Sequence, residues 1–220
     1  TFECDLAESK SEHNQRADLL TPITKAWCSE LCQDITSIAL QVHGGMGYVE
    51  ETGAAQHFRD ARITTIYEGT TGIQANDLIG RKFINDNGSA MNELLDQIEN
   101  DIGISSIESN LKSELNHAIE KSRNVSQFIL ENAQKDPNLA GASSYNFLMM
   151  MGYLVGGWIA SRNITAAKNK MKENDDFEFY NAKIISSTFY IEQFLPLVMS
   201  FGNSVMYGSE SMMSMPDEQF

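Results

Sequence analysis

Residues 39–48 read ALQVHGGMGY, and residues 66–74, about one helix further on, read IYEGTTGIQ. The second stretch places one carboxylate, that of Glu68, after an apolar Ile-Tyr pair on a short turn that opens a new helix. A carboxylate in that setting is expected to be partly desolvated, which suits it to take a proton from a carbon next to a carbonyl. In the first stretch, the glycine-rich turn from Gly44 to Gly47 lets backbone N–H groups approach a large anionic cofactor, because no Cβ stands in the way.

A long amphipathic helix is predicted before the glycine-rich turn. From Pro22 to Val42 the apolar residues recur every three or four positions, which is the spacing of one helix face. Pro22 suits the first turn of this helix, because its missing N–H is not needed there. His43 is then a turn residue, and the glycines after it end the helix. The apolar positions are Ile23, Trp27, Leu31, Ile35, Ile38 and Val42.

A short helix, a connection and a second helix are predicted around Glu68. Residues 53–61 are typical of a short helix, and the β-branched residues within 62–67 predict an extended connection that ends at Glu68. Thr71 and Gln74 have the spacing of a capping box, in which the hydroxyl and the amide satisfy free N–H groups at the start of the next helix. That helix is expected to end at about residue 83 or 84.

The stretch Asn-Asp-Asn-Gly-Ser at 85–89 is dense in turn-forming residues. Such a cluster between two periodic segments predicts a linker. We therefore expect two units in this chain, one at 1–84 and another at 85–220.

The part of the chain beyond the linker has helical periodicity. Apolar spacing predicts one long amphipathic helix at 104–129 and another at 177–198, with a helical segment from 139 to about 172 between them. No segment shows sustained alternation with a period of two. The predicted fold class is therefore all-α, with a partial helical domain followed by a second helical bundle.

Composition excludes several classes of protein. A chain of 220 residues that is 42% hydrophobic can bury a sizeable core, and its formal net charge of -14 disfavours binding to nucleic acid or to an anionic membrane surface. The most apolar run, residues 139–160, contains polar side chains and four glycines, so it fits a buried bundle helix better than a membrane span. Three cysteines without a repeated spacing do not indicate a secreted disulfide framework, and a cytoplasmic location is expected.

Several other side chains have both a functional and a structural interpretation. Cys28 and Cys32 share a helix face, but two small buried hydrophobes are favoured over a metal pair, and no metal site is predicted. Arg59 and Arg62 could contact phosphate groups, although solvated arginines or pairing with Asp60 are favoured. Core packing is likewise favoured over the lining of a pocket for the methionine and aromatic residues, which include Met149, Met150, Met151, Trp158, Phe189, Phe194 and Phe201.

In this order and spacing, the two opening stretches and the sequence FRDARI at 58–63 resemble the C-terminal α-domain of the acyl-CoA dehydrogenase superfamily. Members of that superfamily have an N-terminal helical domain, a middle β-domain and a C-terminal four-helix domain, with flavin (FAD) held between them. Residues from about Leu19 to Phe83 match the later helices of the last domain. The resemblance implies that this chain is the C-terminal fragment of such an enzyme, and the fragment alone is expected to be inactive.

The resemblance also implies a role for each matching residue. Glu68 matches the catalytic base, which removes the α-proton of an acyl-CoA thioester while the β-hydride leaves for FAD, so that 2-enoyl-CoA forms. Gly69 matches a residue that contacts the substrate. The cofactor-contacting positions are Thr70, Thr71 and Gly72 in one turn, and Gln41, Val42, His43, Gly44 and Gly45 in the other. The second group matches a segment that reaches the ADP part of FAD on a neighbouring subunit, which implies a homo-oligomer.

The length of the chain beyond Glu68 points to one subgroup. Short- and medium-chain members end soon after the helix that follows the base, whereas this chain continues for more than a hundred residues. That extension, with GTTGIQA at 69–75 and DLIGRK at 77–82, is similar to the larger bacterial enzymes of the 3-methylmercaptopropionyl-CoA dehydrogenase type. The similarity implies a role in fatty acid metabolism and β-oxidation, with an electron-transfer flavoprotein or a similar acceptor as partner.

Two alternatives stay open within the superfamily. An acyl-CoA oxidase shares the base and the cofactor but passes the electrons to oxygen. A non-catalytic flavoprotein of the alkylation-response type binds DNA through a C-terminal extension, and it predicts a basic stripe on residues 85–220, where Lys and Arg are instead scattered.

Overall fold

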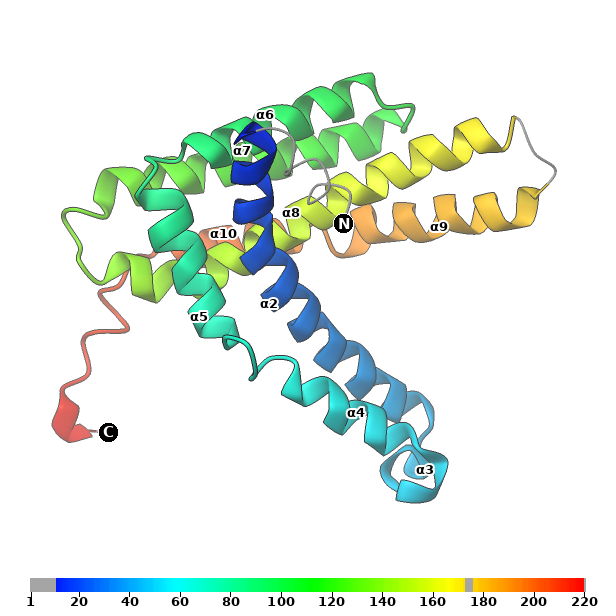
Figure 1. Cartoon of the computed structure of the whole chain (residues 1–220), viewed down its shortest axis with the longest axis horizontal. Helices are drawn as coiled ribbons and strands as arrows, with labels where there is room; N and C mark the ends of the chain where they lie inside the picture. Colours follow the sequence, from blue (N-terminus) through cyan, green and yellow to red (C-terminus); the bar gives the residue numbers. More distant parts are fainter. Residues whose placement is uncertain (1–10, 173–175, 220) are drawn as a thin grey trace.

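The structure of the protein is a computed structural model that describes residues 11–172 and 176–219. All of the regular secondary structure in these residues is helical (Figure 1), so the predicted all-α class is confirmed. The elements before residue 85 are α2 (Ser11–Val42), α3 (Gly45–Tyr48), the 3₁₀ turn η1 (Glu50–Thr52), α4 (Ala54–Ile63), α5 (Thr71–Asn76) and the π-helical η2 (Asp77–Ile84). The elements after it are α6 (Ser89–Ile104), α7 (Ser109–Asn132), α8 (Leu139–Lys170), α9 (Phe177–Gln193), α10 (Leu197–Met206) and the 3₁₀ turn η3 (Asp217–Gln219).

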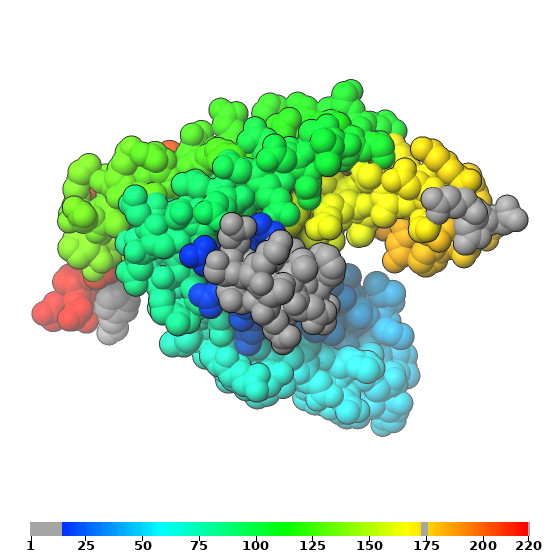
Figure 2. Space-filling model, turned by 45° about the horizontal axis from the view of Figure 1, so that its top comes forward, coloured from blue at the N-terminus to red at the C-terminus, as the bar shows by residue number. Residues whose placement is uncertain are grey.

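Two helices form an arm that projects from the rest of the molecule, and we use the name arm for residues 31–63. In Figure 1 the second half of α2 and α4 run side by side away from the other helices, with α3 at the tip. Figure 2 shows this arm, in blue and cyan, below the green and yellow body of the protein. The first half of α2 lies against the body, where Leu19 and Ile23 are buried, whereas Ile35 and Ile38 on the arm are each 63% exposed. Helix α2 is therefore anchored at one end only.

The core of the molecule is built around α8, which is buried over most of its length. Its fully buried apolar side chains include Phe147, Leu148, Met150, Met151 and Leu154. Residues from both sides of the turn at 85–88 meet here, because the ring centroids of Phe83 and Phe147 lie 5.1 Å apart. The buried Lys82 of η2 also forms an ion pair with Asp18 of α2. The ion pair fixes η2 against α2, and the buried apolar residues on both sides of the turn form one continuous core.

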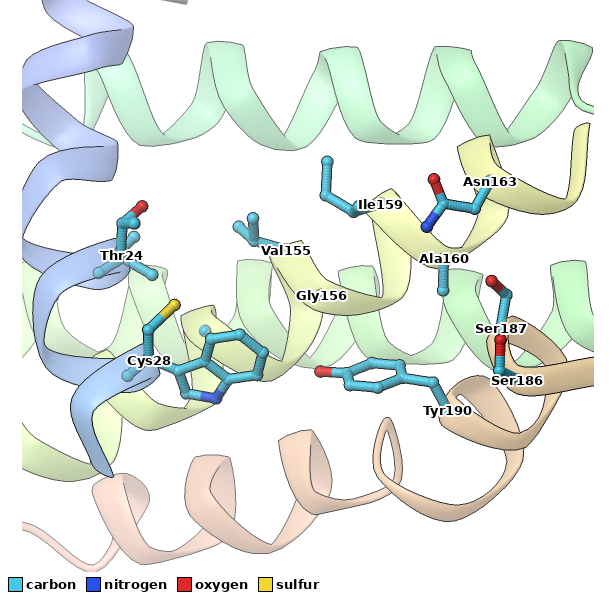
Figure 3. Close-up of a pocket in the computed structure, with 13 residues that line it drawn as sticks. Thr24, Cys28, Val155, Gly156, Ile159, Ala160, Asn163, Ser186, Ser187 and Tyr190 are labelled. Carbon is cyan, nitrogen blue, oxygen red and sulfur yellow. The ribbon is translucent and has the colours of Figure 1, made fainter. Parts of the chain in front are cut away.

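Two glycines of α8 allow neighbouring helices to approach its backbone closely. A Cβ on Gly152 would lie 2.3 Å from the indole ring of Trp27, which α2 contributes. A Cβ on Gly156 would lie 2.1 Å from the hydroxyl of Tyr190 on α9, and that hydroxyl donates a hydrogen bond to the Tyr153 carbonyl at 3.2 Å. A cavity of about 430 Å³ lies beside these contacts, between α2, α8 and α9 (Figure 3).

Helix boundaries differ from the sequence prediction at three places. Helix α2 begins at Ser11, so Pro22 lies inside it and not in its first turn; the buried Leu19 and Ile23 on either side hold the helix together despite the missing N–H. The predicted helix at 104–129 is wrong at its start, because α6 ends at Ile104 and the buried Ile107 belongs to a loop that continues the apolar spacing by chance. The predicted helix at 177–198 is broken at 194–196.

Two predicted packing roles are also corrected. Cys28 is exposed and Cys32 is partly exposed, so the prediction of two buried cysteines is wrong. Met149 to Met151 and Trp158 are buried as predicted, but Phe189 and Phe194 are 55% and 38% exposed. Phe194 lies in the break between α9 and α10, and its ring centroid is 5.8 Å from that of Phe189.

The segment from Phe177 to Met206 is long and apolar enough to cross a membrane by length and composition, with a mean hydropathy of 1.3 in its most apolar window. It is not one continuous helix, because α9 ends at Gln193 and α10 begins only after Pro196. Each of the two helices is shorter than the roughly 20 residues that a membrane-spanning helix needs. Within the described residues this composition alone is weak evidence for a span.

The close contact at Gly152 gives a stability prediction. Gly152→Ala is expected to lower the free energy of unfolding by about 1–3 kcal/mol, because the added methyl group overlaps Trp27 in a packed core. Gly141 on the same helix is the matched control: nothing lies within 4 Å of a Cβ placed there, and alanine favours a helix more than glycine does. Urea unfolding followed by circular dichroism compares the variants, and an equal loss in both would contradict the role of the Trp27 contact.

A second prediction concerns the C-terminal segment, which Asp136 holds against the loop between α7 and α8. The Ser209 hydroxyl donates to Asp136 at 2.6 Å and the Asn138 N–H donates to it at 3.0 Å, and these hydrogen bonds, that from Ser209 first, hold the pKa of Asp136 below its ordinary value. A lowered pKa in the folded state means that this tether is fully present above about pH 4 and is lost as the pH falls further.

We therefore expect the amides of residues 207–213 to lose protection, measured against the intrinsic exchange rate at each pH, below about pH 4 and before the protein unfolds as a whole. Ser209→Ala should produce the same loss of protection at neutral pH, because it removes the donor without altering the charge of Asp136. Exchange that accelerates only together with the core amides of α8 would contradict this tether.

Candidate functional site

The chain reaches Glu68 through a tight turn and not through an extended connection. Helix α4 continues to Ile63, and the N–H groups of Ile66 and Tyr67 then both donate to the Ile63 carbonyl, at 3.0 and 3.1 Å. The predicted extended connection at 62–67 is therefore wrong. The hydroxyl of Thr64 donates to the Ala61 carbonyl at 2.6 Å, so this β-branched side chain supports the turn by bonding back to the helix.

Glu68 itself has a backbone conformation that few residues other than glycine adopt. Its φ is +53°, and that of the following Gly69 is +92°. A Cβ on Gly69 would also lie 2.7 Å from the amide nitrogen of Gln74, so glycine is required there for space as well as for conformation. Left-handed backbone at a residue with a side chain costs free energy and persists only where surrounding contacts enforce it. The turn therefore stores strain at the candidate catalytic residue.

The side chain of Glu68 is exposed in this chain. The apolar residues just before it, Ile66 and Tyr67, are each 49% exposed and do not cover its carboxylate. The expectation that the sequence neighbours partly desolvate Glu68 is therefore wrong for the chain by itself. Any shielding of this carboxylate has to come from groups outside the described residues.

Thr70, and not Thr71, caps the helix that follows. The Thr70 hydroxyl accepts a hydrogen bond from the Ile73 N–H at 3.3 Å, and the Gln74 amide donates to the Glu68 carbonyl at 3.3 Å. The predicted capping box of Thr71 with Gln74 is therefore wrong by one residue. Thr71 is buried, and its hydroxyl donates to the Glu30 carboxylate of α2 at 2.5 Å. A side chain at Gly72 would make only ordinary contact with Thr70, so packing within the described chain does not require glycine there.

Sequence reasoning missed Lys25, which joins α2 to this turn. Its Nζ donates to the Thr64 carbonyl at 2.9 Å and to the Gly69 carbonyl at 2.6 Å, and it lies 5.8 Å from the centroid of the Tyr67 ring. These acceptors are backbone atoms 39 and 44 residues further along the chain. Periodicity of side chains carries no signal for such contacts, and the same holds for Glu30.

The glycine-rich turn lies at the tip of the arm. Gly44 has a φ of +59°, and nothing lies within 4 Å of a Cβ placed on Gly44 or Gly45, so the backbone there is open to approach from outside. Gly47 differs, because its Cβ would lie 2.3 Å from the Leu40 carbonyl, and glycine at that position serves packing against α2. The other predicted cofactor positions in this turn, Gln41, Val42 and His43, are also exposed.

The two candidate turns are not brought together within the chain. Figure 1 places α3 and the glycine-rich turn at the tip of the arm, while the Glu68 turn lies at the other end of α4. The ten residues of α4 span about 15 Å at the usual rise per residue. Glu68, Gly69 and Thr70 to Gly72 thus form one exposed group, and residues 41–45 form another.

The basic residues near the arm are held by hydrogen bonds within the chain. Both guanidinium nitrogens of Arg59 donate to Glu50, at 2.7 and 2.8 Å, and this pairing raises the pKa of Arg59. The Arg59 side chain is 54% exposed, in line with the solvated alternative, while Asp60, the other predicted alternative, accepts from Gln56 at 3.4 Å. Arg62 donates to the Thr65 hydroxyl at 2.6 Å. Across the described residues, no group of three His, Cys, Asp or Glu side chains is placed to hold a metal ion.

Family models match both parts of the chain. The model described as "Acyl-CoA dehydrogenase, C-terminal domain" matches residues 5–83, which contain both candidate turns. The model described as "Acetyl-CoA dehydrogenase C-terminal like" matches residues 91–216, which is more than half of the chain.

Similar proteins of known activity extend over both parts. The chain is 38% identical over 192 residues to 3-methylmercaptopropionyl-CoA dehydrogenase of Ruegeria pomeroyi, a match that covers 86% of this chain and 33% of that protein. It is 32% identical over 195 residues to the broad-specificity linear acyl-CoA dehydrogenase FadE5 of Mycobacterium tuberculosis, with 83% of this chain and 32% of that protein covered. The chain thus spans about a third of the length of these relatives.

A solved structure shares the fold. The crystal structure of Caenorhabditis elegans ACDH-11 in complex with C11-CoA superposes with a TM-score of 0.61 at 19% sequence identity, and the match covers 95% of this chain and 35% of that one. At that identity the likeness concerns the arrangement of helices. The family models and the relatives show that this chain belongs to the acyl-CoA dehydrogenase family.

Proposed function

We propose that this chain is the C-terminal portion of a flavin-dependent acyl-CoA dehydrogenase in which Glu68 is the catalytic base. The observation that carries the proposal is the strained turn that presents Glu68, with its carboxylate exposed and its backbone fixed, at the start of the α5 helix. The family matches support the reaction class, and the coverage of about a third of each relative supports the reading of the chain as a portion of a longer enzyme.

In this proposal the chain contributes the proton-accepting half of the reaction. The Glu68 carboxylate takes the α-proton of an acyl-CoA thioester, which is acidic enough only when the thioester carbonyl is polarised. Among the described residues the Glu68 N–H has no acceptor of its own, so it is available to donate to that carbonyl. Gly69 follows the base directly, and in this proposal it contacts the substrate.

Part of a flavin site fits the residues that are present. FAD, when bound, supplies the acceptor for the β-hydride. The N–H groups of Thr70 and Gly72 would hold it near the base, since that of Thr71 donates to the Thr65 carbonyl, and the open backbone of Gly44 and Gly45 admits a bulky anionic group. Because α4 separates the two turns, we propose that residues 41–45 contact the cofactor of a neighbouring subunit in a homo-oligomer. The remaining contacts and the shielding of Glu68 come from other domains.

We further propose an electron-transfer flavoprotein or a similar acceptor as the partner, because the reduced cofactor has to be reoxidised in each cycle. A cytoplasmic role in fatty acid β-oxidation fits Cys28 and Cys32, which are free. The alkylation-response alternative is not favoured, because in the extension Arg123 is engaged with Asp96 and Glu99, at 2.6 and 2.9 Å, and does not form part of a basic stripe.

Glu68→Gln in the complete flavin-loaded enzyme is expected to slow reduction of the flavin by acyl-CoA by about 10²–10⁴-fold, because the amide cannot accept the α-proton. The flavin should remain bound, since the substitution keeps the size of the side chain. Stopped-flow absorbance of the flavin under anaerobic conditions measures the rate. Glu51→Gln is the matched control, being an exposed acid at the other end of α4 that should leave the rate unchanged. Undiminished turnover in Glu68→Gln would rule out this base.

The oxidase alternative is separated by the electron acceptor. A dehydrogenase given acyl-CoA is expected to reduce an artificial dye or an electron-transfer flavoprotein quickly and to form little hydrogen peroxide in air. An oxidase forms peroxide in proportion to the substrate consumed. Measuring peroxide and dye reduction side by side in the same preparation decides between the two.

A further inference from the structure

The side chain of Lys25 bridges the two ends of the Glu68 turn. From α2, its ammonium group donates to the carbonyl of Thr64 before Glu68, at 2.9 Å, and to that of Gly69 after it, at 2.6 Å. Its charge also lies 5.8 Å from the centroid of the Tyr67 ring, within the range of a cation–π contact. One side chain therefore touches the turn at three residues that flank Glu68 on both sides.

Before Glu68 the turn is bonded back to the end of α4, by the Ile66 and Tyr67 N–H groups on the Ile63 carbonyl and by Arg62 on the Thr65 hydroxyl. Few bonds apart from those of Lys25 connect the residues before Glu68 to those after it. Outside the helix ends, its own backbone contributes the bond from the Thr71 N–H to the Thr65 carbonyl, at 3.3 Å, and the Gln74 amide adds one to the Glu68 carbonyl, also at 3.3 Å. Both are longer than the charge-assisted bonds of Lys25. Glu68 nevertheless holds a left-handed backbone conformation that a residue with a side chain leaves readily unless it is held.

The backbone of Lys25 is held firmly in α2. Its neighbours on α2, Ile23 and Ala26, are buried in the core, and its own carbonyl accepts the Ser29 hydroxyl at 2.5 Å. Lys25 therefore stands at the end of α2 that is fixed to the body, and not on the exposed arm. Because the backbone of Lys25 is held by the core, its hydrogen bonds fix residues 64–69 relative to the core.

We propose that Lys25 is a positioning residue for the reaction, which holds the Glu68 turn in the conformation that aims the carboxylate at the substrate. This inference rests on the proposed function for the reaction that it assists. The statement that Lys25 holds residues 64–69 in place depends only on the contacts within this chain. A misplacement of the base of about 1 Å would then cost on the order of a hundredfold in rate.

Lys25→Met and Lys25→Arg in the complete flavin-loaded enzyme test the proposal. Methionine keeps an unbranched apolar stem but removes the donors, whereas arginine keeps a charge and several donors. Lys168→Met is the matched control, because Lys168 also donates to a distant backbone carbonyl, that of Ser106, at 3.0 Å, but far from the turn in sequence. Two measurements are made: amide hydrogen exchange of residues 64–72, and the rate of flavin reduction by acyl-CoA together with KM.

Lys25→Met is expected to accelerate exchange in residues 64–72 and to slow flavin reduction by about tenfold to a hundredfold, while KM changes much less. Lys25→Arg should restore part of the rate, and Lys168→Met should leave both measurements as in the unmodified enzyme. A purely structural lysine would lower the melting temperature without slowing flavin reduction well below it, and that result would overturn the proposal. Unchanged exchange in residues 64–72 would overturn it as well.

Failure of the proposed function has a different signature. If the unmodified enzyme does not reduce its flavin with any acyl-CoA, the assignment of the reaction fails for reasons unrelated to Lys25. The exchange experiment uses no substrate and still decides whether the lysine holds the turn.

Discussion

The close approach of neighbouring helices to the backbone of α8 is the constraint on which the rest of the structure depends. Gly152 leaves the space that Trp27 fills, and Gly156 leaves the space for Tyr190. Through Trp27 the anchored half of α2 is seated on α8, and through Tyr190 the same helix receives α9. Because proteins pack their interiors at close to crystal density, a single methyl group at these positions is felt by both neighbours. The body of the molecule thus defines where α2 stands, and α2 defines where the candidate site stands.

The position of the Glu68 turn depends on how α2 packs against α8. Lys25 and Glu30 lie near the anchored half of α2 and reach the turn and the first residue of α5, through the Gly69 carbonyl and the Thr71 hydroxyl respectively. The glycine-rich turn, in contrast, is carried on the unanchored arm, whose apolar residues Ile35, Ile38 and Val42 are exposed. Helix α2 therefore holds the Glu68 turn from its anchored half and carries the exposed residues 41–45 at its other end. Such an arrangement suits a chain whose two candidate turns serve different partners.

Much of the helical framework could be predicted from the sequence, because apolar spacing determines which faces are buried. The most apolar run of the sequence located α8, and periodicity indicated the helical character of α2 and α7. Periodicity failed where an apolar residue lies in a loop, as Ile107 does. The exposed half of α2 has the same spacing as the buried half, so periodicity alone does not reveal that Ile35 contacts no core. The roles of the candidate residues came from resemblance and stay predictions. The local geometry at Glu68 was out of reach, because β-branched residues before it favour extended backbone, whereas here the Thr64 hydroxyl bonds back to the Ala61 carbonyl and a side chain distant in sequence, Lys25, donates to the Thr64 carbonyl.

The left-handed backbone at Glu68 has a consequence for how such a chain changes over many generations. Glycine or asparagine would occupy that conformation at lower cost than glutamate, so selection for stability alone would tend to replace the carboxylate. Glutamate at this position therefore costs stability, as is expected of a residue that is kept for its side chain. Copies that no longer need this side chain are expected to drift at residue 68 first, and to gain stability as they lose the acid. The identity of residue 68 would then indicate whether a related protein still uses this site.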